Sequence, residues 1–218
     1  MFTKIKSRRG ETLIEVFVAT IVLVVGALAV TRLFAVATIN NQLTKERAIA
    51  TNLAREGLEA VRIIRDTNWL RYAGERRSCW NNLELSACTG LPSDAIGHRQ
   101  NYIVKFDTSN YRWVLDADDL PERLNIDDGD ISFEDEKYRL QIDSANGLYN
   151  HAVAVGDDTV FYREIYTEYL KDDQTLAAGP DANILRVTAK VAWYDRGKIS
   201  DVVLTTILTD YLGRKNHD

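Results

Sequence analysis

The sequence predicts an α+β fold in which one long N-terminal helix packs against an antiparallel β-sheet. An uncharged, mostly apolar stretch near the amino terminus has the length of a membrane-spanning helix. A proline-free amphipathic pattern continues this helix to about residue 68. Runs of alternating polar and apolar residues, separated by turn residues, then fill the second half of the chain. The 218 residues suit one such domain with an appended helix.

The apolar stretch covers residues 13–37 and contains two charges, Glu15 and Arg32. Together with its flanks it reaches the roughly 20 residues that cross a bilayer core. A basic cluster with no acid precedes it, made of Lys4, Lys6, Arg8 and Arg9. Because basic residues beside a first span stay on the cytoplasmic side, we expect a single-pass protein whose C-terminal part lies outside the inner membrane.

The charge balance argues against a nucleic-acid binder. The formal net charge is -5, and because residues 1–10 hold four basic residues and no acid, the remainder carries -9. An acidic chain lacks the overall basic charge of a nucleic-acid binder, although the net charge would hide a local basic patch, so a nucleic-acid partner is not favoured.

The residues at the start of the helix carry a recognisable motif. The string RGETLIEV at residues 9–16, followed by the apolar helix, resembles the class III signal of type IV pilins and type II secretion pseudopilins. In that family a membrane-embedded prepilin peptidase cuts after the glycine, and the new amino terminus is N-methylated. The resemblance implies that Gly10 ends a leader of residues 1–10, that Glu11 begins the mature chain, and that Glu15 is its fifth residue. Glu11 departs from the Phe or Met usual there, which leaves its methylation open.

Glu15 is the costly residue of this helix. A carboxylate in hydrocarbon costs about 2 to 3 kcal/mol or more when unpaired. One hypothesis is that it neutralises the α-amine of Glu11 on a neighbouring subunit, since a buried charge needs a partner. The alternative is that Glu15 lies at the membrane interface and is hydrated.

A rival export signal lies further along the helix. Ala27, Leu28 and Ala29 form a small-x-small site after an apolar run, as in ordinary secretory peptides. Cleavage there would release a soluble protein. Glu15 interrupts the apolar region, which favours the prepilin reading.

Residues 39–70 continue the helix into the domain. Apolar or small residues recur at positions 39, 43, 50, 53, 57, 60, 61 and 64, which is the spacing of one helix face. We expect this stripe to pack on the C-terminal domain. The helix would then run from about residue 12 to 68, roughly 85 Å at about 1.5 Å per residue. Residues 53–70 resemble the corresponding stretch of minor pilins of the PilV-like type.

Residues 71–218 are expected to form the extracytoplasmic β-rich domain. Residues 71–100 contain turn formers and are predicted to be a loop. Strands are predicted at 101–107, 111–116, 138–143, 160–170, 185–193 and 201–211, the last two joined as a hairpin. Cys79 and Cys88 can close a small disulfide if the domain is exported to an oxidising compartment.

The sequence offers no chemistry for a cofactor or a catalyst. The histidines His98, His151 and His217 lack metal-ligand spacing, and the motifs of common hydrolases and phosphate-binding loops are missing. An acidic cluster is a candidate for calcium or for a solvated loop. It comprises Asp116, Asp118, Asp119, Asp127, Asp128 and Asp130. We therefore expect no cofactor and no enzymatic activity.

The function that the resemblance implies is a structural subunit, a minor pilin or pseudopilin, of a type IV pilus-like filament. Its partners would be other subunits, prepilin peptidase, the inner-membrane assembly platform and, before assembly, membrane lipid. The precursor would reside in the inner membrane, and the mature subunit in a cell-surface or periplasmic filament. A filament-tip subunit for adhesion or DNA uptake, or a type II secretion pseudopilin, is the alternative.

Overall fold

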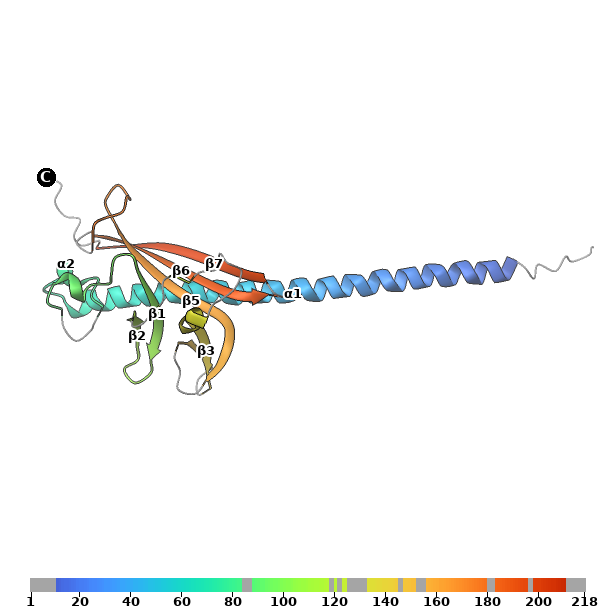
Figure 1. Cartoon of the computed structure of the whole chain (residues 1–218), viewed down its shortest axis with the longest axis horizontal. Helices are drawn as coiled ribbons and strands as arrows, with labels where there is room; N and C mark the ends of the chain where they lie inside the picture. The colour runs from blue at the N-terminus through green and yellow to red at the C-terminus, as the bar shows by residue number, and fades with distance from the viewer. Residues whose placement is uncertain are drawn as a thin grey trace, which may run out of the picture. The chain divides into compact units, whose positions relative to one another are not determined.

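The structure is a computed structural model that describes residues 11–83, 88–117, 120, 123–124, 133–144, 147–151, 156–179, 183–195 and 198–210. It confirms the α+β class, with one long N-terminal helix and a seven-stranded antiparallel sheet (Figure 1). The chain divides into two units between Glu46 and Arg47, which are described separately. The helices are α1 (Glu11–Arg71), α2 (Arg76–Cys79), η1 (Pro92–Asp94) and η2 (Phe133–Tyr138). The strands are β1 (Gln100–Asp107), β2 (Arg112–Asp116), β3 (Arg139–Asp143), β4 (Tyr149–Asn150), β5 (Gly156–Leu170), β6 (Ile184–Asp195) and β7 (Lys198–Thr209).

The first unit contributes the apolar part of α1. Every residue from 13 to 42 is exposed, so the apolar side chains have no protein partner within this unit. Its hydroxyl groups are satisfied locally, because Thr20, Thr31 and Thr38 each donate to a backbone carbonyl three or four residues earlier at 2.8 to 2.9 Å. Such internal bonds let a hydroxyl sit in an apolar environment. The helix is long and apolar enough to cross a membrane.

The domain part of α1 buries the predicted stripe from position 50 to position 64, whereas Ile39 is exposed and Leu43 is half-buried. Within the second unit its buried residues are Ala50, Leu53, Ala54, Gly57, Leu58, Ala60, Val61, Ile64, Asn68 and Trp69. They recur every three or four residues, as a helix face turned toward a core does. They join the apolar side chains of β5 and β6 in one cluster. α1 ends at Arg71, three residues beyond the predicted end.

Gly57 marks the closest approach of α1 to the sheet. A Cβ atom at this position would lie 2.7 Å from Cδ1 of Ile165 and 3.8 Å from Cβ of Ala189. Glycine has low helix propensity, and the sequence offers no other sign of why it is here. The structure supplies the reason, since a larger side chain here would require the Ile165 side chain or the helix to shift.

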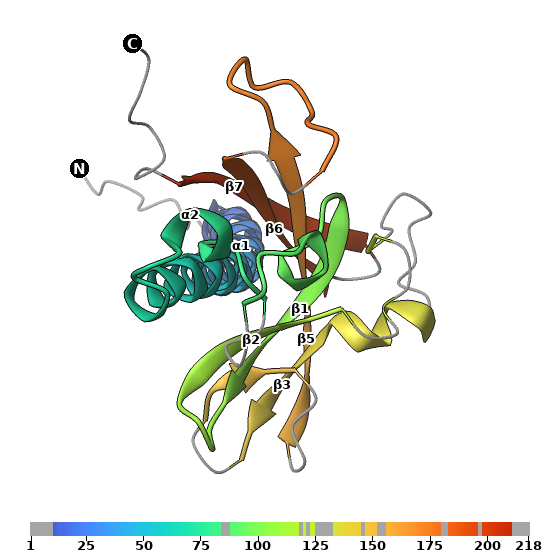
Figure 2. The same cartoon turned by 90° about the vertical axis from the view of Figure 1, so that its left-hand side faces the viewer.

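β5 is the central strand of the sheet, and its two edges pair with different strands. One edge pairs with β6, which in turn pairs with β7. The other edge is shared: residues 165–167 pair with β1, whereas residues 156–162 pair with β3. From Ile103 onward β1 leaves β5 and pairs with β2. Figure 2 shows the result, with the β1–β2 hairpin and the β3 region as separate branches.

The β6–β7 hairpin confirms the alternation predicted from the sequence. Its inward residues in β6 are buried and lie on the α1 side: Leu185, Val187, Ala189, Val191 and Trp193. The pairing with β7 is continuous from Ile184 opposite Thr209 to Asp195 opposite Lys198. This hairpin and β5 provide the face against which the domain part of α1 packs.

Several predicted boundaries were wrong. β5 starts at Gly156, four residues before the predicted start, because its first residues pair with β3. β2 starts at Arg112, since Tyr111 has a φ of 49° and cannot continue a strand. The predicted loop at 71–100 contains the short helices α2 and η1. β4 and η2 are too short to leave a periodic pattern in the sequence.

Candidate functional site

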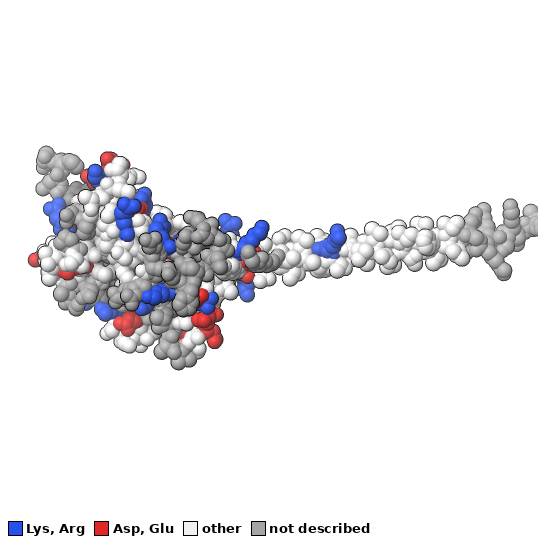
Figure 3. All heavy atoms as spheres, viewed as in Figure 1, with Lys and Arg blue, Asp and Glu red and all other residues white. Residues whose placement is uncertain are grey.

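The predicted processing site lies at the start of α1. Gly10 falls outside the described residues. Glu11 is the first residue of the helix, and Glu15 is exposed one turn later. On the face drawn in Figure 3, most of the described surface of this helix is uncharged. Glu15 is an exposed acid on a mostly apolar stretch whose other charge is Arg32, and its partner stays a prediction.

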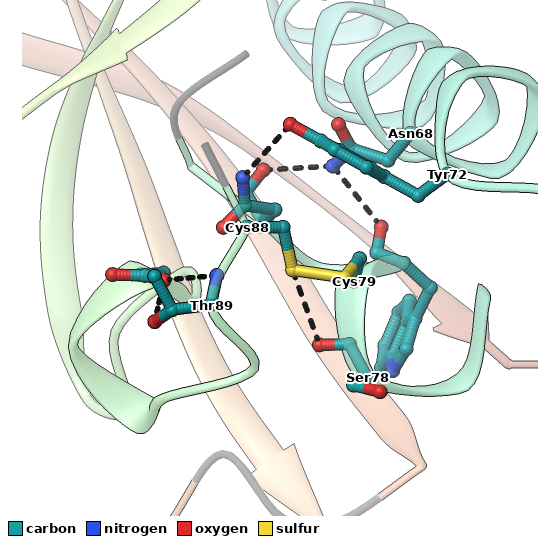
Figure 4. The surroundings of a disulfide bond; sticks show 9 residues. Asn68, Tyr72, Ser78, Cys79, Cys88 and Thr89 are labelled. Carbon is teal, nitrogen blue, oxygen red and sulfur yellow. Dashed lines mark hydrogen bonds between the residues drawn. A yellow bond between two sulfur atoms is a disulfide. The ribbon is translucent and has the colours of Figure 1, made fainter. Parts of the chain in front are cut away.

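A disulfide joins Cys79, at the end of α2, to Cys88. The loop that it closes is attached to the last turns of α1 through Asn68 (Figure 4). The Asn68 amide donates to the carbonyls of Trp80 at 3.3 Å and Asn82 at 2.7 Å. Asn68 is fully buried, so these bonds are shielded from water. Disulfide and amide together fix the segment after α1 to the end of the helix.

Reduction of this disulfide is expected to lower the free energy of unfolding by about 2 to 3 kcal/mol, because a loop of about ten residues regains its freedom in the unfolded chain. The measurement is urea unfolding of the full chain in a mild detergent, with and without reductant. The variant carrying Cys79→Ser and Cys88→Ser should match the reduced protein and show no response to reductant. An unchanged midpoint on reduction would contradict a stabilising role.

A buried arginine links the helix to two strands. The guanidinium of Arg163, on β5, is fully buried. It donates to Glu56 Oε1 at 2.9 Å and to the Leu53 carbonyl at 3.3 Å, both on α1. It also donates to the Val104 carbonyl of β1 at 3.2 Å. Burial lowers the pKa of Arg163, and the charge of Glu56 opposes this shift. Arginine stays protonated in proteins, so a positive charge is held in the domain interior beside one carboxylate.

His151 lies next to this arginine and is almost fully buried. Its Nδ1 is 2.9 Å from the Val104 carbonyl, and its Nε2 is 3.2 Å from the Tyr138 carbonyl. Burial lowers the pKa of His151 to about 3, with a further contribution from the charge of Arg163. The ring is therefore neutral at pH 7 and can donate to only one of these two carbonyls at a time. This position is structural and offers no access to a metal or substrate.

The remaining metal candidates are accounted for by protein contacts where the structure describes them. His98 Nδ1 accepts a hydrogen bond from the Tyr169 backbone at 3.0 Å, whereas His217 lies outside the described residues. Asp116 pairs with Lys105 at 2.5 Å. The other members of the acidic cluster, Asp118, Asp119, Asp127, Asp128 and Asp130, also lie outside. Within the described residues no three His, Cys, Asp or Glu side chains gather as a metal site.

Sequence reasoning missed the buried pair of Arg163 and His151. Arg163 lies in a run whose alternate members, Phe161 and Ile165, are buried toward α1. An arginine at an inward position of such a run is the signal that could have identified it. Of the predicted site residues, Cys79 and Cys88 are joined in the second unit, and Glu11 and Glu15 belong to the first unit.

Comparison with protein-family models, curated proteins and solved structures gives no match to this chain.

Proposed function

We propose that this chain is a structural subunit, a minor pilin or pseudopilin, of a type IV pilus-like filament, processed after Gly10 and assembled through α1. The observation that supports it most is the exposed apolar helix of residues 13–42 with an acid one turn from its start. Water is a poor solvent for such a surface, so it must be covered by lipid or by other helices. A filament core made of identical helices supplies that cover after the subunit leaves the membrane.

Glu15 would favour one particular arrangement of neighbouring helices, which an apolar helix in lipid alone would not need. An ionised carboxylate among apolar side chains is destabilising unless a cation reaches it. Cleavage before Glu11 creates an α-amine, and the amine of one subunit can pair with Glu15 of the next. That pairing would fix the axial offset between neighbouring helices. The domain needs no catalytic role in this function, and prepilin peptidase and the assembly platform are its transient partners.

The processing step is tested by mass spectrometry of the amino terminus of protein purified from membranes of its native host. We expect a mature chain that begins at Glu11. Gly10→Ala should accumulate the uncut precursor, whereas Gly26→Ala, a matched change within the helix, should be processed normally. A mature start between Ala27 and Thr31 would overturn the proposal, because it would release the domain as a soluble protein.

Assembly is tested separately with processed protein. Glu15→Leu should still be cut and inserted, yet be lost from the sheared filament fraction on immunoblots. Thr20→Val, which removes a hydroxyl already bonded within the helix, is the matched control and should enter filaments as the wild type does. Wild-type incorporation of Glu15→Leu would remove the role given to this carboxylate.

A further inference from the structure

A groove of about 1170 Å³ lies between the last turns of α1 and strand β2. Its helical wall includes Ile63, Thr67 and Arg71. Its other wall includes Phe106 and every residue of the segment 110–117. All of these residues belong to the second unit. Figure 2 shows β2 beside α1 at the margin of the sheet.

The residues of β2 that line the groove show whether the groove lies against a face of this strand or along its edge. Side chains of a strand alternate between its two faces. Trp113 and Leu115 pack on the core, whereas Arg112 and Asp116 lie on the opposite face. A hollow against one face would be lined by alternate residues only. The groove therefore follows the edge of β2.

That edge is open among the described strands. β2 pairs with β1, and no other described strand pairs with it. The backbone N–H and C=O groups on the outer edge of a strand form hydrogen bonds with any extended chain that lies alongside. Strand addition to such an edge is a common mode of peptide recognition. The groove is thus shaped for a chain rather than for a compact molecule.

The side chains of the groove set the chemistry of that chain. Ile63 is 47% exposed and faces the groove together with the partly buried ring of Trp113. Trp113 packs edge-to-face on Phe106, with ring centroids 5.1 Å apart. This wall would accept apolar side chains that alternate along an added strand.

The polar side chains favour an acidic residue. Arg71 is exposed and has no ion-pair partner within the described part of the chain. Arg112 Nε lies 3.5 Å from Asp107 Oδ2, too far for a strong hydrogen bond. The carboxylate of Asp107 already accepts from the backbone of Ser109 and Asn110. Arg112 is thus shared with Asp107, and Arg71 is the cationic side chain of the groove that can attract a carboxylate of a ligand.

The tip of the β1–β2 hairpin supplies an aromatic side chain at an unfavourable backbone position. Tyr111 has a left-handed φ of 49° and is 83% exposed. Glycine or asparagine would adopt this conformation at lower cost. Backbone strain that displays a large exposed side chain is typical of functional sites, and exposed tyrosines are frequent anchors in interfaces.

We propose that this groove binds an extended segment of a partner protein as an added strand on β2. Its apolar side chains would contact Ile63 and Trp113, and an acidic side chain would pair with Arg71. A carbohydrate would use the aromatic surfaces but not the open backbone edge, so a peptide fits the whole groove better. This site goes beyond the filament role and does not depend on it.

The experiment uses the full chain in detergent micelles and the fluorescent octapeptide Val-Thr-Val-Thr-Val-Thr-Glu-Thr, whose valines and glutamate lie on one face of an extended strand, with binding followed by anisotropy. Two derivatives carry N-methyl groups on alternate amides, one set on the even residues and the other on the odd. Only one set faces β2 in an added strand. We expect one derivative to bind as the parent does and the other to lose about tenfold or more in affinity, because its backbone donors are removed.

Variants of the protein test how much the side chains that line the groove contribute to peptide binding. Ile63→Asn is expected to weaken binding about tenfold through lost apolar contact, whereas Leu70→Asn, an exposed apolar change outside the lining, should have no effect. Arg71→Gln should weaken binding of the parent peptide about threefold. For a peptide that carries Lys in place of Glu, the Arg71→Gln variant and the wild type should bind equally well. Arg55→Gln, an exposed arginine elsewhere on α1, is its matched control.

Three results would overturn the proposal. Equal affinities for the two methylated peptides would exclude strand addition. Binding of an acidic oligosaccharide, such as oligogalacturonate, without binding of any peptide would assign the groove to carbohydrate. If the chain self-associates, if Ile63→Asn abolishes this self-association, and if no peptide binds, the groove would be assigned to contact with a second copy of the chain.

Discussion

Acidification from pH 6.5 to pH 4 is expected to lower the free energy of unfolding by about 3 kcal/mol through His151 alone. The unfolded chain protonates this residue near its ordinary pKa of 6.5, whereas the folded domain holds the pKa at about 3. The unfolded state therefore binds more protons throughout this window, so stability is complete above pH 6.5 and falls as the pH approaches 3. The groups around the ring are the cationic side chains of Arg163 and Lys105.

The measurement is urea unfolding of the full chain at several pH values between 4 and 7.5, followed by tryptophan fluorescence. Other carboxylates also titrate, so the quantity of interest is the difference from His151→Gln, which keeps polar groups of similar reach but cannot take up a proton. We expect a shallower pH dependence in this variant. Parallel curves for the two proteins would show that His151 does not titrate between the folded and unfolded states in this window.

Glu56→Ala is expected to destabilise the domain by about 3 kcal/mol, because it leaves the fully buried guanidinium of Arg163 without its carboxylate. Removing one partner of a buried ion pair costs about 3 to 5 kcal/mol, and the partial exposure of Glu56 places it at the lower end. Arg163→Met should cost less, since it removes the buried charge itself and keeps most of the volume.

The double variant Glu56→Ala with Arg163→Met should therefore be more stable than Glu56→Ala alone. Glu59→Ala is the control, since Glu59 lies one turn away and pairs with Arg62 on the exposed side of α1. Exposed pairs contribute about 0 to 1 kcal/mol. Equal losses for Glu56→Ala and Glu59→Ala would mean that water, rather than Glu56, compensates the charge of Arg163.

The elements that the sequence predicts best are those with one buried face. The stripe on α1 between Ala50 and Ile64 and the alternation in β6 both follow directly from their periods. The start of β5 is harder to delimit, because residues 156–160 are exposed or half-buried without alternation and are held in the strand by pairing with β3. Without a buried face, no period in the sequence marks where the strand begins.

The features of the candidate sites also differ in whether the sequence alone can identify them. The motif at Gly10 and Glu15 is local, so it can be identified in the sequence. The groove depends on which edge of β2 stays open, and the burial of Arg163 depends on a contact with a residue 107 positions away. Such contacts are set by topology, which no local pattern specifies. Gly57 illustrates both situations. The sequence shows a residue of low helix propensity within the helix, but it does not show that this residue packs closely on Ile165.

The packing of α1 against β5 and β6 also determines when the domain can fold. Leu53 and Arg163 are joined across 110 positions of the chain, and β6 follows still later. Closing so long a loop is slow and entropically costly, and high contact order delays folding. During synthesis the stripe of α1 must wait, uncovered, until the last strands have emerged from the ribosome. In the proposed function, insertion of the apolar part of α1 into the membrane would limit the diffusion of the unfinished chain and its encounters with other unfinished copies.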